Sequence, residues 1–297
     1  MESKLEPQSQ PLPAVGALLR EWRVRRRLSQ LDLALEAEIS QRHLSFVESG
    51  RAMPSRDMVL RLSERLEVPL RERNRILLAA GFAPYYAERS IDDPSLAAAI
   101  ATVELVLKGH EPNPAIAVDR EWNLVLANRA IAPLLQLVED ASLLVPPVNV
   151  LRLSLHPGGL APHIVNFDVW RDHLLERLHR LNDQVADPGL HALEDELRSY
   201  PAPARTGPAR HDYSAIAVPL RLRVGGEELS FISTITVFGT PLDVTLSELA
   251  VESFFAADAR TAMILRTMAD SGGCPPIAAA RPCAPSPFPA PAGARAR

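Results

Sequence analysis

The stretch Ser29–Ser55, SQLDLALEAEISQRHLSFVESGRAMPS, contains two short helical patterns joined by a turn. Ser29 stands at an N-cap position, with Asp32 three residues later as an acidic variant of the capping box. Ser40 is the N-cap candidate of the second helix. Each pattern has one inward side, made of Leu33 and Ala34 in the first helix and of Leu44, Val47 and Glu48 in the second. The stretch therefore predicts two helices that pack against each other.

The turn between these helices carries Glu38, where a glycine is usual. If Glu38 takes a positive φ, the conformation costs on the order of 1 kcal/mol, which a packed bundle can absorb. Its carboxylate is then expected to face solvent.

Three further helices extend the pattern on both sides. They are predicted over Val15–Arg26, after the N-cap candidate Ser55, and over Arg71–Ala80, which ends at Gly81. Helices this short are marginal alone, so their apolar stripes must be buried against one another. We expect a compact five-helix bundle over residues 14–84.

The periodicity is mixed over residues 92–269, where we expect a second domain with both helices and strands. The expected helices are Asp92–Lys108, a helix capped by Asn128 over Arg129–Val138, Phe167–Gln184, Leu190–Ser199 and Ala257–Ala269. The expected strands are Ala115–Val118 with Trp122–Ala127, alternating runs on either side of Gly225 and Gly226 from Ile216 to Val237, and Val251–Phe255. The fold class is therefore predicted to be α+β.

Composition limits the remaining possibilities. A chain of 297 residues with 47% hydrophobic and 23% charged residues is typical of about two globular domains. The polar arm over residues 1–13 and the Pro/Ala-rich tail over residues 271–297 are expected to be disordered. Both cysteines, Cys274 and Cys283, lie in that tail, so no disulfide framework is expected. No apolar run approaches membrane-spanning length, and we expect a cytoplasmic protein without membrane insertion.

The net charge of −4 is unevenly distributed along the chain. Residues 1–80 carry 14 Lys and Arg against 11 Asp and Glu, whereas the remainder is acidic. We therefore expect the N-terminal part, and not the acidic remainder, to approach phosphates.

The order of signals in the five-helix region resembles the helix-turn-helix domain of the phage-repressor family, called Cro/C1 or XRE type. The resemblance rests on Gln30 at the start of one helix, Ala34 at the crossing point, Ser40 as cap, Glu48, and the Gly50-Arg51 exit. It implies double-stranded DNA as the partner, a pseudo-palindromic operator and a homodimer.

The resemblance also implies roles for individual residues. Gln41, Arg42 and Ser45 fall where the family contacts base edges, and their chemistry suits this, since Gln can bond adenine and Arg guanine. Gln30 and Arg51 match phosphate-contacting positions. Each is also the kind of polar residue that an ordinary solvated helix surface carries.

Phe46 and the pair formed by Arg23 and Glu48 lie close to these residues in the same region. Phe46 departs from the family pattern and could meet a thymine methyl group or pack on the neighbouring helix. Arg23 and Glu48 correspond to an internal ion pair, which also follows locally because a buried carboxylate needs a cation.

The second domain resembles the ligand-binding domain of MmyB-like transcription regulators, which implies a PAS-like fold and a small, apolar, acyl-like ligand. The resemblance rests on PAIAVDREWNLVLANRAI from Pro114, PPVNVLRLSLHPGGLAP from Pro146 and ELSFISTITVFGTPLDVTLSELAVESFF from Glu228. The candidate ligand contacts, expected to point inward, are Trp122, Leu124, Leu151, Leu153, Trp170, Phe231, Ile235 and Phe238. For any one of them, plain core packing is the more common reason for an inward side chain.

Motifs of catalysis are absent from the sequence. It has no HExxH or CxxC array, no phosphate-binding glycine loop and no GxSxG elbow, so no metal, cofactor or enzymatic activity is expected. A single histidine could ligate a haem, but no other haem-binding feature accompanies any histidine of this sequence. We predict a ligand-responsive, DNA-binding transcription regulator. The alternatives are a protein-interaction module, or an enzyme acting on an acyl substrate with a regulatory helical domain.

Overall fold

A computed structural model describes residues 14–185, 187–203, 218–238 and 243–271. The expected disordered arm, the tail with Cys274 and Cys283, and Ile216 lie outside the described residues. The chain forms two compact units that interleave along the sequence. The first comprises Met1–Ile100, Arg177–His191 and Val237–Leu249, and the second comprises the segments between and after them.

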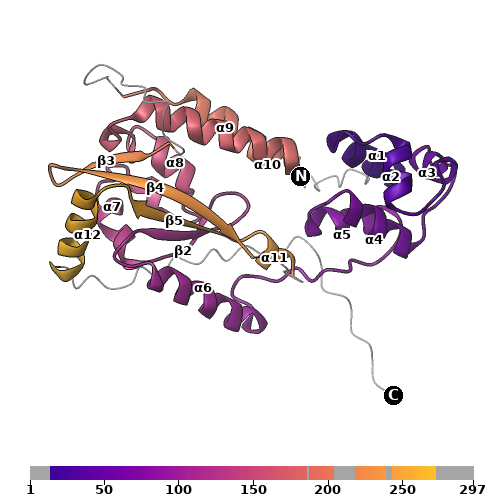
Figure 1. The fold of residues 1–297 in the computed structure, drawn as a ribbon, viewed down its shortest axis with the longest axis horizontal. Coiled ribbons are helices and arrows are strands. Elements are labelled where there is room, and N and C mark those ends of the chain that lie inside the picture. Colours follow the sequence, from indigo (N-terminus) through magenta and orange to yellow (C-terminus); the bar gives the residue numbers. More distant parts are fainter. Residues whose placement is uncertain (1–13, 186, 204–217, 239–242, 272–297) are drawn as a thin grey trace, which may run out of the picture. The chain divides into compact units, whose positions relative to one another are not determined.

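The N-terminal helices form the predicted bundle (Figure 1). Their bounds are α1 Val15–Arg25, α2 Gln30–Glu36, α3 Gln41–Glu48, α4 Arg56–Arg65 and α5 Leu70–Ala79. Ser29, Ser40 and Ser55 each accept a hydrogen bond from the backbone N–H three residues later. At Ser29 the complete capping box with Asp32 is present. The apolar stripes of the five helices meet in one buried core.

All five helices of the bundle end in the same way, with one residue in the left-handed region. At the α2–α3 turn this residue is Glu38, with φ of 55°, and its side chain is exposed as expected. Glu38 N–H donates to Leu35 O and Ile39 N–H to Ala34 O, which is the Schellman pattern. Equivalent residues end the other helices: Arg27, Gly50, Glu67 and Gly81. Three of the five positions thus hold a charged residue where glycine is favoured.

Helices α1 and α3 approach each other closely at Gly16. A Cβ atom at this position would lie 2.2 Å from the carbonyl oxygen of Val47 and 2.9 Å from that of Glu48. Only glycine leaves room for the α3 backbone at this distance. Gly16 therefore sets how close α3 lies to α1.

The second unit is built on a five-stranded sheet with the order β2-β1-β5-β4-β3. The strands are β1 Ala115–Val118, β2 Leu124–Ala127, β3 Leu220–Val224, β4 Glu227–Val237 and β5 Ala250–Ala256. β1 pairs antiparallel with β2 and β5, and β3 with β4. Gly225 and Gly226 both have positive φ and form the expected two-residue turn between β3 and β4. The α+β fold class is confirmed, and the PAS-like character stays a prediction.

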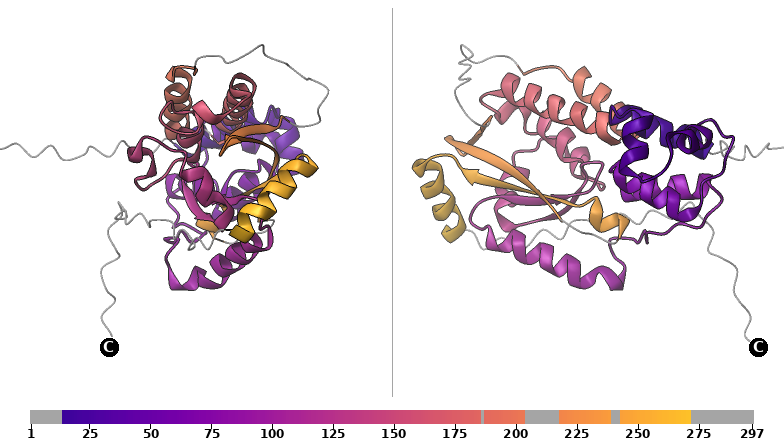
Figure 2. Two further views of the ribbon diagram at one scale, coloured as in Figure 1. Left: turned by 90° about the vertical axis from the view of Figure 1, so that its left-hand side faces the viewer. Right: turned by 45° about the vertical axis from the view of Figure 1, so that its right-hand side comes forward.

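The remaining helices precede, connect or follow these strands. Their bounds are α6 Ala97–Gly109, α7 Ala132–Leu135, α8 Val150–Leu155, α9 Phe167–Val185, α10 Pro188–Ser199, α11 Val244–Ser247 and α12 Ala259–Ser271, with 3-10 turns at Pro94–Leu96, Arg129–Ile131, Ala141–Leu144 and Ala161–His163. α9 and α10 run side by side (Figure 2), joined by bonds from Asn182 to Leu190 O and from Arg171 to Arg198 O. None of the helices in the described ranges is long and apolar enough to cross a membrane.

The prediction that Asn128 caps a long helix is wrong. Its side chain makes no capping bond, and only a 3-10 turn and the short α7 follow. Instead its oxygen accepts from Ala115 N–H, while its amide donates to Leu107 O and Asn113 O. Because these bonds join three separate segments, Asn128 ties β1 to α6 and does not serve its own helix.

The turn between β1 and β2 is tight and strained at Trp122. This residue has φ of 65° and is only 6% exposed. Asp119 accepts bonds from the backbone N–H of Glu121 and Asn123, and burial raises the pKa of its carboxyl. Trp122 therefore belongs to a turn and not to the strand predicted from Trp122 to Ala127.

Candidate functional site

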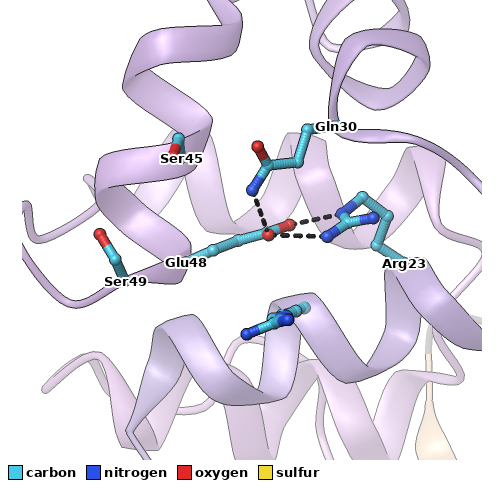
Figure 3. A pocket seen from close by; sticks show the side chains of 6 residues that line it. Arg23, Gln30, Ser45, Glu48 and Ser49 are labelled. Atoms are coloured by element: carbon cyan, nitrogen blue, oxygen red, sulfur yellow. Dashed lines mark hydrogen bonds and ion pairs between the residues drawn. The ribbon is translucent and has the colours of Figure 1, made fainter.

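A buried ion pair lies at the centre of the bundle, between α1 and α3. Arg23 Nε donates to Glu48 Oε1 at 2.6 Å, and Arg23 Nη2 donates to Oε2 at 2.8 Å. Gln30 Nε2 adds a third bond to Oε2 at 2.8 Å (Figure 3). The Glu48 side chain is only 2% exposed. Side chains from three helices therefore meet at the Glu48 carboxylate. The Arg23–Glu48 ion pair is the one expected from the sequence, and Gln30 is an additional donor.

This arrangement keeps Glu48 charged. Burial alone would raise the pKa of its carboxyl, but the hydrogen bonds from Arg23 and Gln30 outweigh it and hold the pKa below the ordinary value. Arg23 also donates to Leu28 O at 2.8 Å, so each nitrogen of its guanidinium has a partner. The pair is fully satisfied and fixes α1 relative to α3.

A pocket of about 400 Å³ opens beside this ion pair. Its lining residues come from α1, α2, α3 and the residue directly after α3: Arg20, Arg23, Gln30, Ser45, Glu48 and Ser49. In Figure 3 Ser45 on α3 and Ser49, which directly follows α3, lie on either side of the hydrogen-bonded Glu48 in the chain. Arg20 is exposed, so it can supply a positive charge at this opening. The lining is polar and carries one carboxylate, Glu48, beside the two guanidinium groups of Arg20 and Arg23.

The predicted base-contacting residues lie on the outer part of α3. Gln41 and Arg42 open the helix and are exposed, and Ser45 follows one turn later and is half-buried. Among the described residues, the Gln41 and Arg42 side chains have no hydrogen bond or ion pair. They are therefore available to an external partner.

Phe46 is half-buried and lies between two arginines. The guanidinium carbon of Arg42 is 5.4 Å from the centre of its ring, and that of Arg51 is 6.0 Å away. Both distances are within the range of cation–π attraction. Phe46 thus provides a ring against which the two expected DNA-contacting arginines rest.

The sequence did not show three features of this site. The Gln30 amide points partly inward to Glu48, so a phosphate contact would use its other amide hydrogen. Arg20 and Ser49 line the pocket, although no motif singles them out. Gly16 was also missed, and its only signal is a glycine within an otherwise helical pattern.

Most of the expected ligand contacts are indeed buried in the second unit. Trp122, Leu151, Leu153, Trp170 and Phe231 are at most 6% exposed, and Leu124 is half-buried. Trp170 Nε1 donates to Ser154 Oγ at 3.1 Å, which fixes its ring.

Two of the expected inward residues point outward. Ile235 is 42% exposed and Phe238 is 37% exposed, so the prediction that they face inward is wrong. In the register of β3 and β4 the pairing ends at Leu220 and Phe231. β3 therefore does not extend alongside Ile235, although β4 continues as a strand to Val237 next to β5. On this part of β4 the alternating pattern does not separate a buried face from an exposed one, since Leu229 and Phe231 are buried and Ile235 and Val237 are exposed.

Comparison with known families yields two matches. The model of the MmyB-like transcription regulator ligand binding domain matches residues 99–268. The helix-turn-helix model matches residues 19–73. No curated protein matches the chain.

Proposed function

This chain belongs to the family with an MmyB-like transcription regulator ligand binding domain and also carries a helix-turn-helix, so it is a DNA-binding transcription regulator with a ligand-sensing domain. We propose which residues read the DNA and which class of ligand the second domain binds. The proposed reading surface is the outer face of α3, with Gln41, Arg42 and Ser45 on base edges. The proposed ligand is a small apolar molecule with an acyl chain. The exposed, unpaired state of Gln41 and Arg42 is the observation that carries the first proposal.

The chemistry of the surface supports contact with base edges. Arg42 can donate two parallel bonds to a guanine, and Gln41 can pair with an adenine in the same way. Phe46 rests against Arg42 and Arg51 and limits their motion, which reduces the entropy lost on binding. Arg51 and Arg20 then supply positive charge to the backbone phosphates beside the groove.

A single helix of this kind reads only a few base pairs. We propose that two copies of the chain bind two half-sites about 34 Å apart, so the operator is pseudo-palindromic. Selection of duplexes from a random library by the full-length chain tests this directly. We expect the enriched sequences to contain an inverted repeat, and a single unrepeated site would contradict the dimer.

Replacing Gln41 or Arg42 by alanine is expected to weaken binding to the selected duplex. Each loses a bidentate contact of about 1–3 kcal/mol, which is roughly 5- to 150-fold in Kd. Preference at one base pair should relax in each variant, because the loss is confined to the base that the residue contacts. Titration against the selected duplex and its point variants measures both effects.

The matched control is Arg65→Ala, which removes an exposed arginine of the same bundle outside α3. It should leave the sequence preference unchanged. If Gln41→Ala and Arg42→Ala bind all duplexes like the wild type, the assigned reading surface is wrong.

The apolar ligand is supported by side chains that the second unit leaves in contact with solvent. Ile232 and Ile235 on β4, Phe255 on β5 and Met263 on α12 are each at least 39% exposed. Contiguous exposed apolar side chains are typical of surfaces that bind a ligand or another protein. Ile232 and Ile235 lie three positions apart on β4 and so face opposite sides of the strand, and the test below therefore concerns Ile235 alone. Ile235 is the member of this group that the sequence also predicts as a ligand contact.

Gently purified full-length chain is expected to retain an apolar molecule that native mass spectrometry detects. Added myristate should bind, and Ile235→Glu should weaken this binding roughly tenfold, since it loses the burial of one aliphatic side chain. The control is Leu105→Glu, which alters an exposed leucine of α6 outside the predicted contacts. Equal binding by both variants would contradict the assigned site, and no myristate binding by the wild type would contradict the acyl class.

A further inference from the structure

The connection between β4 and β5 is acidic and belongs to the first unit. From Asp243 onward it consists of Asp243, the short helix α11, Glu248 and Leu249, and it runs directly into β5 at Ala250. We call Asp243–Leu249 the acidic connection. Val244 and Leu249 at its ends are at most 2% exposed. A surface loop would not normally bury both of its apolar ends, so this segment is docked.

One anchor of the acidic connection is Arg71 of α5. Arg71 Nε and Nη2 donate to the two carboxylate oxygens of Glu248, each at 2.8 Å, in a fork arrangement. The third nitrogen, Nη1, bonds to Glu88. The bond from Glu248 outweighs burial and raises the pKa of Arg71, so this side chain stays charged. The Arg71 and Glu248 side chains are 25% and 17% exposed, which partly protects the pair from solvent.

A second anchor lies at the start of the acidic connection. Asp243 caps α11 by accepting from Thr245 N–H at 2.9 Å, and its other oxygen accepts from Arg89 Nη1 at 2.7 Å. Val244 N–H donates to Ala87 O at 2.8 Å. The segment that follows α5 is thus held by backbone and side-chain bonds together.

That following segment is in turn fixed to α5. Asn74 Oδ1 accepts from the backbone N–H groups of Tyr85 and Tyr86, and its amide donates to Tyr86 O at 2.8 Å. Arg73 Nη1 donates to the Tyr86 hydroxyl at 3.0 Å. Residues 85–89 are therefore fixed to α5 by hydrogen bonds. They form one bonded network with α5 and with the acidic connection.

The other end of the acidic connection continues into the sheet. β5 pairs with β1 from Ala250 opposite Val118 to Ser253 opposite Ala115. Glu248 is two residues before this pairing begins. Only Leu249 separates the carboxylate-bearing Glu248 from the first paired residue of β5.

We propose that the acidic connection is the docking element that links the state of the ligand-sensing sheet to the helix-turn-helix bundle, with Arg71 as its anchor on α5. The proposal rests on the proposed function, because it assumes that the bundle binds DNA. Coupling between two sites is reciprocal, so DNA bound by the bundle must alter the sheet if the sheet controls DNA binding. This allows a test that does not require the natural ligand.

The test is hydrogen exchange of the full-length chain with and without the duplex enriched from the random library. In the wild type, the duplex is expected to protect α3 and to change the exchange of amides in β1 and β5. Arg71→Gln and Glu248→Gln should each abolish the change in β1 and β5 while the protection of α3 remains. The double variant should match either single variant, because both act through one contact.

Arg75→Gln is the matched control, since Arg75 lies on the same helix but pairs with Glu72. It should keep the wild-type response, and exchange of α1–α5 without DNA reports whether each variant folds. The proposal is overturned if β1 and β5 respond to DNA in Arg71→Gln and Glu248→Gln as in the wild type, or if they do not respond in the wild type while α3 is protected. Absence of α3 protection in the wild type would overturn the proposed function, and this proposal with it.

Discussion

Glu48→Ala is expected to lower the free energy of unfolding of the helical bundle by about 3–5 kcal/mol, the cost of leaving one partner of a buried ion pair uncompensated. Arg23 would keep only its bond to Leu28 O, and Gln30 would lose its partner in the pocket. Since Arg23 is 9% exposed, water cannot readily replace the lost carboxylate. Exchange of the slowest amides in α1 and α3 of the full-length chain measures the effect.

The double variant Arg23→Met with Glu48→Leu separates a lost charge partner from lost packing. Replacing both members of a buried pair by apolar residues is often neutral or stabilising, so the double variant should be more stable than Glu48→Ala. If it is as unstable as the single variant, the ion pair does not dominate the loss.

The same pair makes the bundle sensitive to acid. The folded state holds the pKa of Glu48 below its ordinary value, so the stabilisation is fully present above the ordinary carboxyl range. It is lost as the pH falls through the folded pKa, where the carboxylate takes up a proton. Glu48→Gln should lack this part of the acid dependence, and an unchanged acid profile in that variant would assign it to other groups.

Gly16→Ala is expected to destabilise the bundle by about 3 kcal/mol and to weaken DNA binding as well. The added Cβ would lie 2.2 Å from Val47 O and 2.9 Å from Glu48 O, both backbone atoms that cannot swing aside. Helix propensity alone favours alanine by about 1 kcal/mol, so the sign of the change reports the steric contact. α3 would have to move away from α1, which shifts Gln41 and Arg42 together. Exchange of α1 and α3 amides and titration with the selected duplex measure the two effects.

Gly109→Ala is the matched control for this substitution. Gly109 ends α6, and a Cβ there would meet no atom within 4 Å. The same chemical change should therefore be neutral or slightly stabilising. If Gly16→Ala is equally well tolerated, α1 and α3 are not held at the distance described.

The bundle could be predicted closely because its signals are local. Ser29, Ser40 and Ser55 cap the helices at the expected positions, since an N-cap acts on a backbone group three residues away. The Arg23–Glu48 pair could also be inferred, because a carboxylate on an inward side requires a cation. The direction of the Gln30 amide could not, since it depends on where α2 places it relative to α3.

The second unit was predicted less well because its contacts are distant in sequence. Asn128 follows a strand and looks like a helix cap, yet its bonds go to Leu107, Asn113 and Ala115. Ile235 continues an alternating pattern on β4 past the end of its pairing with β3, and the pattern does not report where that pairing ends. In the first unit, too, the bond between Arg71 and Glu248 spans 177 positions and has no local signal.

Arg27, Glu38 and Glu67 have left-handed backbone conformations, and substitutions at these three positions can raise the stability of the bundle. Glycine at any one of them would relieve roughly 1 kcal/mol of backbone strain. Natural proteins are rarely at their stability optimum, and such positions are where stability can be regained. If α3 is the reading helix as proposed, a substitution on it that changes operator choice at some expense to folding can be compensated at a helix end. Recognition of new operators can diversify in this lineage without loss of the scaffold that presents it.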